Sequence, residues 1–162
     1  MAVELELTRT KGDRRLYALE GVGTLRLQGF FSYAATAEAG GDRWRIARTG
    51  FWRRAIVATD RLGAEVGRFD PRTLRRGGAL RWDGREFALR PASSWRERYA
   101  IVDGERELVL LDGKDWGRRP VKITIDDPEA VDAGLILFAA FVVRGLAEDA
   151  AASATVVTSG GA

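Results

Sequence analysis

The segment Val131–Ala147 constrains the fold of this chain more than any other part of the sequence. Between Gly134 and Val143 it contains no polar residue. In a helix, which turns by about 100° per residue, the consecutive bulky side chains Leu135–Phe138 would point in four different directions. A helix that is apolar all round has to be buried on every side, either in protein or in lipid.

The residues before this segment predict where the helix begins. Asp127 can cap the first free N–H groups, and Pro128 suits the first helical position, where no N–H is needed. The uncharged run from 133 to 143 has eleven residues, well short of the ~20 that a membrane-spanning helix needs. We therefore expect a protein-buried helix over about 128–148 and no transmembrane span. Its core residues are predicted to include Leu135, Leu137, Phe138, Phe141 and Val142.

The chain before the helix shows the two-residue alternation that is typical of β-strands, first at Val3–Thr8. The pairs Asp83-Gly84, Asp103-Gly104 and Asp112-Gly113 are expected to form tight hairpin turns, because this dipeptide tolerates positive φ. The pattern predicts about twelve strands in total. The others are expected at Leu16–Leu19, Leu25–Leu27, Phe30–Thr36, Arg43–Arg48, Trp52–Thr59, Ala64–Phe69, Ala79–Trp82, Glu86–Arg90, Trp95–Val102, Glu107–Leu111 and Val121–Ile125.

Many short antiparallel strands and one apolar helix favour a mainly β fold, a closed antiparallel barrel that encloses the C-terminal helix. About eight strands can be filled by side chains alone, whereas about twelve leave an interior space. A helix with its side chains is roughly 10–12 Å across, so the helix would fill the bore. Gly134, Ala139, Ala140 and Gly145 would let side chains of the wall approach its backbone.

The chain shows no internal boundary, so we expect one barrel domain over residues 1–150. The small and polar residues 151–162 are predicted to form a flexible tail, with a short strand at Thr155–Val157.

The chain contains neither Cys nor His. This excludes disulfides, thiol nucleophiles, the usual zinc sites and histidine-based catalysis. We predict no cofactor, no metal and no enzymatic activity. The first residues lack a basic region followed by an apolar one, so no signal peptide is expected. We expect a cytoplasmic protein that can associate peripherally with a membrane.

The charges are unevenly distributed along the sequence. Residues 1–102 carry a net charge of +8 and residues 103–162 a net charge of −5. The first two-thirds could therefore present a basic surface to an anionic partner, such as a lipid headgroup or another phosphate-bearing ligand. The alternative is an ordinary solvated surface on which the two signs partly neutralise each other.

The candidate site consists of arginines on two neighbouring strands and on the following loop. A guanidinium group suits phosphate because it can form two parallel hydrogen bonds with it. The alternative role is structural, with the aliphatic stems of these arginines covering Trp and Ile on an outer face. The predicted anion-binding residues are Arg43, Arg45, Arg48, Arg53, Arg54, Arg72, Arg75 and Arg76.

Two other sequence patterns are typical of binding sites. Tryptophans next to arginines, such as Trp44-Arg45 and Trp52-Arg53, could stack on the bases of single-stranded nucleic acid. Neighbours in a strand point to opposite faces, so these tryptophans are expected to line the barrel, and nucleic acid is not expected as a partner. The acidic residues Asp126, Asp127, Glu129 and Asp132 could bind calcium, but helix capping explains them and their spacing is not that of an EF-hand.

The chain resembles the tubby C-terminal-like superfamily in the layout of residues 1–150. The likeness rests on the strand Val121–Asp126, which runs through an acidic Asp-Asp-Pro turn into Gly134–Ala140. This group includes tubby proteins, phospholipid scramblases and LURP-one-related proteins, the last of which the chain resembles most in size. The resemblance implies a barrel around a central helix. Tubby proteins bind phosphoinositide headgroups through basic residues, so it also implies anion binding, without residues that can be matched one by one.

The expected function is therefore a non-enzymatic binding module for anionic lipid headgroups or other phosphate-bearing ligands. A second hypothesis is a protein-interaction scaffold of unknown partner, which requires an exposed apolar patch or a free strand edge. A third is a scramblase-like protein that inserts its helix into the bilayer.

Overall fold

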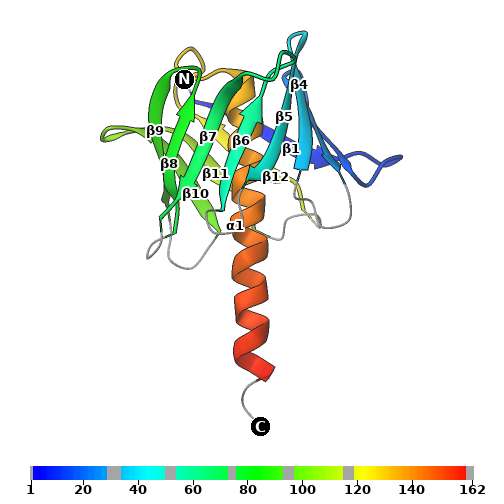
Figure 1. Ribbon diagram of the computed structural model, residues 1–162, viewed down its shortest axis with the longest axis vertical. Coiled ribbons are helices and arrows are strands. Elements are labelled where there is room, and N and C mark those ends of the chain that lie inside the picture. The colour runs from blue at the N-terminus through cyan, green and yellow to red at the C-terminus, as the bar shows by residue number, and fades with distance from the viewer. Residues whose placement is uncertain are drawn as a thin grey trace.

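In the computed structural model, the described residues are 2–28, 34–49, 54–72, 76–92, 97–114 and 119–159, with side chains through 149. Within this part, twelve antiparallel strands form a closed barrel around one C-terminal helix (Figure 1). The strands are β1 Val3–Arg9, β2 Leu16–Leu19, β3 Gly23–Gln28, β4 Ala34–Ala39, β5 Asp42–Thr49, β6 Ala55–Thr59, β7 Glu65–Pro71, β8 Gly78–Trp82, β9 Arg85–Pro91, β10 Arg98–Asp103, β11 Arg106–Asp112 and β12 Val121–Ile125. The predicted fold is thus confirmed.

Each strand pairs with its neighbours in chain order, and β1 pairs with β12 to close the ring. At this seam the register runs from Val3 opposite Ile125 to Leu7 opposite Val121. The connections therefore alternate between two ends of the barrel. We call the end that holds the β4–β5, β6–β7, β8–β9 and β10–β11 turns and the start of the helix the upper end. The opposite end, from which the helix emerges, is the lower end (Figure 1).

The helix α1, Ala133–Ser159, runs through the bore of the barrel. All of the predicted core residues are buried, with exposed fractions of 0–3%: Leu135, Leu137, Phe138, Phe141 and Val142. The predicted close approach is confirmed at both ends of the buried stretch. A Cβ atom at Gly134 would lie 2.4 Å from the ring of Trp82, and one at Gly145 would lie 2.7 Å from Arg48 Nη2.

The predicted start of the helix is wrong by five residues. Asp127 does not cap the helix; its carboxylate accepts from the N–H of Glu129 and its carbonyl from the N–H of Ala130, which makes a separate turn. Arg85 Nη1 donates to the carbonyl of Ala130 at 2.8 Å and ties this turn to β9. The actual cap is Asp132, which accepts from the N–H of Leu135 at 3.3 Å.

The far end of the helix also differs from the prediction. Residues 151–159 continue α1, so the predicted strand at Thr155–Val157 is wrong, while the flexibility predicted for this tail stays a prediction. The physical reason is that Ala is the best helix former, and neither Gly nor Pro interrupts the chain between Gly145 and the glycine pair at 160–161.

Two of the three predicted Asp-Gly hairpins are confirmed. Asp83 and Gly84 both have positive φ, 48° and 77°, as a type I′ turn requires. Between β10 and β11 only Gly104 has positive φ among the described turn residues, and a bulge lies between Ile101 and Val102. The prediction at Asp112-Gly113 is wrong. Gly113 instead donates its N–H to the carbonyl of Glu97, and a Cβ there would lie 2.8 Å from Val143 of the helix.

Parts of the predicted strands at Phe30–Thr36, Trp52–Thr59 and Trp95–Val102 lie outside the described residues. Within the described ranges, we find no helix with both the length and the apolarity that crossing a membrane requires.

Candidate functional site

The six described arginines of the predicted set are not all brought to one place. Arg48, Arg54 and Arg72 line a single cleft at the lower end of the barrel. Arg43 and Arg45 instead lie exposed on the outer wall of β5, where Arg43 forms an ion pair with Glu38 at 2.8 Å. Arg76 is exposed and does not line the cleft. Arg53 and Arg75 lie outside the described residues.

The cleft has a volume of about 830 Å³ and lies between β5–β7 and the part of α1 that leaves the bore. Its floor is apolar and is formed by side chains of both the sheet and the helix. These are Ile56, Phe69, Val142 and Leu146. Cationic and acidic groups stand around this floor, so the cleft combines an apolar base with a charged rim.

Arg48 enters the cleft because of its position in β5. Along this strand Trp44 and Ile46 face the bore, and Arg48 follows them at the same two-residue spacing. Its side chain is only 21% exposed and lies over Gly145 of the helix. The sequence pattern predicted a cationic outer face here, whereas the inward direction of Arg48 brings its charge to the mouth of the bore.

Asp149 lies between the arginines of the cleft. Its Oδ2 is 3.8 Å from Arg48 Nη2 and 3.4 Å from Arg54 Nη1. Strong charge-assisted hydrogen bonds are shorter, about 2.7–2.9 Å. The carboxylate therefore places a negative charge in the cleft, and its hydrogen bond with Arg54 is longer than the strongest bonds of this kind.

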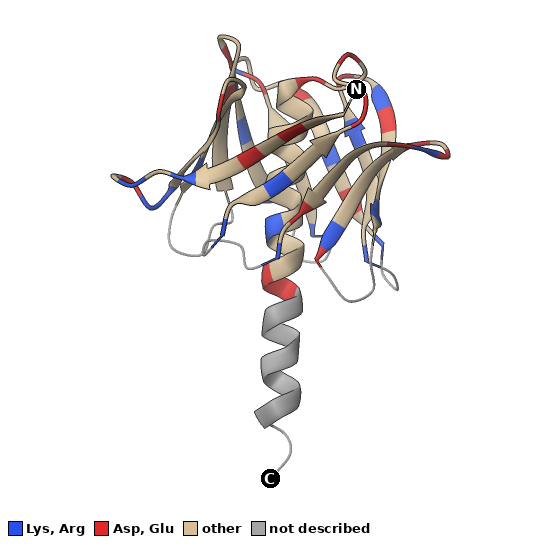
Figure 2. Cartoon of the chain, turned by 180° about the vertical axis from the view of Figure 1, so that it is seen from behind, with Lys and Arg blue, Asp and Glu red and all other residues tan. Residues whose placement is uncertain are grey.

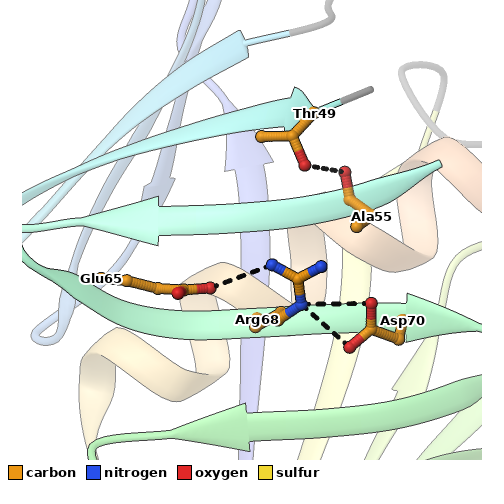
Figure 3. A network of polar contacts seen from close by, with 5 residues as sticks. All are labelled: Thr49, Ala55, Glu65, Arg68 and Asp70. Carbon is orange, nitrogen blue, oxygen red and sulfur yellow. Dashed lines mark hydrogen bonds and ion pairs between the residues drawn. The ribbon is translucent and has the colours of Figure 1, made fainter. Parts of the chain in front are cut away.

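Arg68 is a cleft residue that the sequence analysis missed. Its Nε donates to both carboxylate oxygens of Asp70, at 3.1 and 3.0 Å, and its Nη1 donates to Glu65 at 3.4 Å (Figure 3). The hydrogen bond to Asp70 is the main cause that raises the pKa of Arg68. The spacing of Arg68, Asp70 and the predicted Arg72 by two residues is the signal that could have found it.

Arg144 places a further charge at the mouth of the bore. Its side chain is 13% exposed and forms an ion pair with Glu148 at 2.9 Å, four residues on along the helix. Burial lowers the pKa of Arg144 below its usual value, and the charge of Glu148 opposes this shift. The charge of the nearby Arg48 adds to the lowering, so two guanidinium groups act on each other where α1 emerges.

The acidic segment before the helix has structural roles. A hydrogen bond from Arg106, with 2.7 Å between Nη2 and Oδ2, is the main cause that lowers the pKa of Asp127. Asp132 caps the helix. Among the described residues, no group of three or more acidic side chains gathers in a way that could hold a metal ion.

The described tryptophans face inward, as predicted. Trp82 is 4% exposed. Its ring lies 5.6 Å from that of Trp44 in an edge-on arrangement and 5.6 Å from that of Phe138 on the helix. Such contacts fix the helix in the bore and leave these rings unable to stack on bases. Trp52, Trp95 and Trp116 lie outside the described residues.

No family model, curated protein or solved structure matches this chain. The resemblance to the tubby C-terminal-like superfamily therefore stays a prediction.

Proposed function

We propose that the protein is a non-enzymatic binding module that holds an anionic group, foremost the phosphate of a lipid headgroup, in the cleft at the lower end. The observation that carries this proposal is the convergence of Arg48, Arg54 and Arg72 on one cleft with an apolar floor. Arginine is the side chain best suited to bind phosphate in two parallel hydrogen bonds.

The lengths of the ion pairs around Asp149 are consistent with such a ligand. Arg48 and Arg54 stand 3.8 and 3.4 Å from Asp149, longer than the bonds they can form with a phosphate oxygen. Arg72 is exposed, and no carboxylate pairs with it within the described part of the chain. The apolar floor suits the carbon atoms next to a headgroup better than it suits a free inorganic ion.

Vesicle sedimentation tests the proposal. The protein should bind phosphatidylcholine vesicles that contain phosphatidylglycerol, should not bind pure phosphatidylcholine, and should be released by salt. An Arg near an anionic surface contributes about 1 kcal/mol, so reversing it in Arg54→Glu or Arg72→Glu should weaken binding roughly 30-fold.

Arg45→Glu is the matched control. Arg45 is on β5 like Arg48, has the same charge, and faces outward away from the cleft. Binding that is lost equally in Arg45→Glu and Arg72→Glu would refute a cleft site, and salt-independent binding would refute an electrostatic one.

No observation favours the other two hypotheses. The barrel has no free strand edge among its described strands. Two large apolar side chains are exposed in the described part, Val3 at the start of β1 and Leu62 between β6 and β7. Two separate side chains do not make the apolar patch that a scaffold requires. The apolar half of α1, which the scramblase hypothesis inserts into a bilayer, is enclosed by the barrel.

A further inference from the structure

The two ends of the barrel carry opposite charge. At the lower end, exposed basic residues follow one another around the ring at four connections: Arg54, Arg72, Arg90 and Lys114. The acidic residues Asp70 on β7 and Asp112 on β11 are each paired with an arginine, Arg68 and Arg98. On α1, Glu148 pairs with Arg144 and Asp149 lies beside Arg48. Arg54, Arg72, Arg90 and Lys114 then leave a positive net charge around the helix exit.

The upper end is acidic. Its turns and the start of the helix expose Asp42, Asp83, Glu105, Asp126 and Glu129. Of the described basic residues at this end, Arg43, Arg85 and Arg106 are each paired with a carboxylate, and Arg61 donates to the carbonyl of Gly41. Figure 2 shows acidic segments in the upper turns and basic segments at the strand ends around the helix exit. The barrel thus has a charge separation along its axis.

The helix continues out of the lower end. Residues 150–159 extend α1 beyond the strands (Figure 1). At 1.5 Å per residue, ten residues add roughly 15 Å. The sequence contains no charged residue after Asp149. An uncharged rod rich in Ala, Val and Thr therefore projects from the centre of a basic ring.

We infer that the barrel stands upright on an anionic bilayer, with the lower end against the headgroups, the projecting end of α1 in the interfacial region, and the acidic upper end facing away. This inference rests on the proposed function and gives its site a partner and an orientation. The buried half of α1 stays in the bore.

The charge separation sets the orientation. The surface of an anionic leaflet attracts each basic residue near it by about 1 kcal/mol and repels acidic residues by the same field. This field falls off within about one Debye length, ~10 Å at moderate salt. The ring of basic residues is attracted when the lower end faces the membrane, and the acidic turns are then outside the reach of the field.

A bilayer fits this end better than a nucleic acid does. A rod of roughly 15 Å at the centre of the basic ring keeps a rigid duplex away from the arginines around it. A leaflet can accommodate the same rod between its headgroups. Stable peripheral binding usually combines a polybasic surface with an apolar element, and the lower end offers both.

Single labels can measure the orientation, because the full chain has no cysteine that would have to be removed. The variants are Val157→Cys, on the projecting helix, and Leu62→Cys, in the β6–β7 turn at the upper end, where Leu62 is 94% exposed. Each carries an environment-sensitive fluorophore, and the vesicles contain phosphatidylglycerol and nitroxide-labelled lipid. We expect the lipid to quench the label at 157 and not the label at 62.

Val157→Asp tests the contribution of the helix end in the full chain, with Leu62→Asp as its control. Loss of apolar contact at the interface, together with repulsion of the added carboxylate by the anionic surface, should weaken vesicle binding roughly 30-fold in Val157→Asp and leave it unchanged in Leu62→Asp. Circular dichroism spectra of both variants should match that of the parent chain.

The outcomes separate this inference from the proposed function. If vesicles bind and depend on Arg72 but the label at 157 is not quenched, the orientation is refuted while the cleft stands. If a soluble inositol phosphate binds and vesicles do not, the bilayer is refuted and anion binding stands. If neither binds, both proposals fail. Quenching at 62 would show that the barrel docks in another orientation.

Discussion

Asp149 is the residue whose charge most directly opposes a ligand in the cleft. It is the carboxylate nearest to both Arg48 and Arg54 in the described structure. An anion that binds there has to displace it or share the two guanidinium groups with it. If the proposed function holds, Asp149 competes with the ligand for these two guanidinium groups.

Asp149→Asn should strengthen binding to phosphatidylglycerol vesicles, by about fivefold for one negative charge removed near the surface. Glu148→Gln is the control, because it removes the same charge from the next residue, which pairs with Arg144 instead. Vesicle titration should show a larger gain for Asp149→Asn. Equal gains would mean that only the net charge matters and that the cleft has no specific role.

At the scale of elements, α1 and the wall fit together through glycines. Gly134 lies under the rings of Trp82 and Trp44, and Gly113 of the wall lies under Val143 of the helix. These contacts are possible only where a glycine lacks the Cβ atom. They therefore fix both the rotation of the helix about its axis and its position along the bore.

Gly134→Ala tests this fit. Forcing a methyl group against two tryptophan rings should cost about 3 kcal/mol, the upper end of the usual range for overpacking, and the better helix propensity of Ala recovers about 1 kcal/mol. We expect a net loss of roughly 2 kcal/mol in urea denaturation. Gly12→Ala is the control, because a Cβ there meets nothing within 4 Å, and it should change stability by less than about 0.5 kcal/mol. Similar changes in the free energy of unfolding for both variants would show that Trp82 and Trp44 can move to accommodate a methyl group at position 134.

The alternation of apolar and polar residues was sufficient to predict the strands, since each position in a barrel wall faces either the bore or the solvent. It could not show that Arg48 follows Trp44 and Ile46 inward, because an arginine at the end of a bore can reach water while its neighbours cannot. The turn predicted at Asp112-Gly113 was wrong because the sequence does not show which residue the glycine has to accommodate. Glycine was needed there to admit Val143, and not for a positive φ.

The candidate site was predicted only in part. The arginine-rich segments pointed to Arg48, Arg54 and Arg72, but a linear pattern cannot separate these from Arg43 and Arg45, which the sheet places on the outer wall. Asp149 lay next to a segment that was expected to be loose, so its contact with β5 had no signal in the sequence.

At the scale of the whole molecule, the buried part of α1 can reach water only if the barrel opens between two strands. The residues from Leu135 to Val143 are buried on all sides, and every described strand is paired on both edges. Local opening therefore cannot expose the centre of the helix.

Native-state hydrogen exchange should show this. The amides of Phe138–Val142 should exchange with the free energy of global unfolding, whereas the helical amides after Asp149, which lie beyond the strands, should exchange at much lower free energy (Figure 1). Mass spectrometry of peptides from the two halves of α1 measures the difference. Uniform protection along the whole helix would contradict it.

The seam between β1 and β12 has a consequence for biosynthesis. During translation, all twelve strands leave the ribosome before α1 does. A nascent chain therefore contains every strand of the barrel before the helix that fills its bore is available. We expect β1 and β12 to form their lasting pairing only after α1 has been synthesised, because the closed barrel leaves no opening wide enough to admit a helix. A transcript that stopped before Ala133 would therefore yield a sheet without a centre, with its apolar inner face open to other chains.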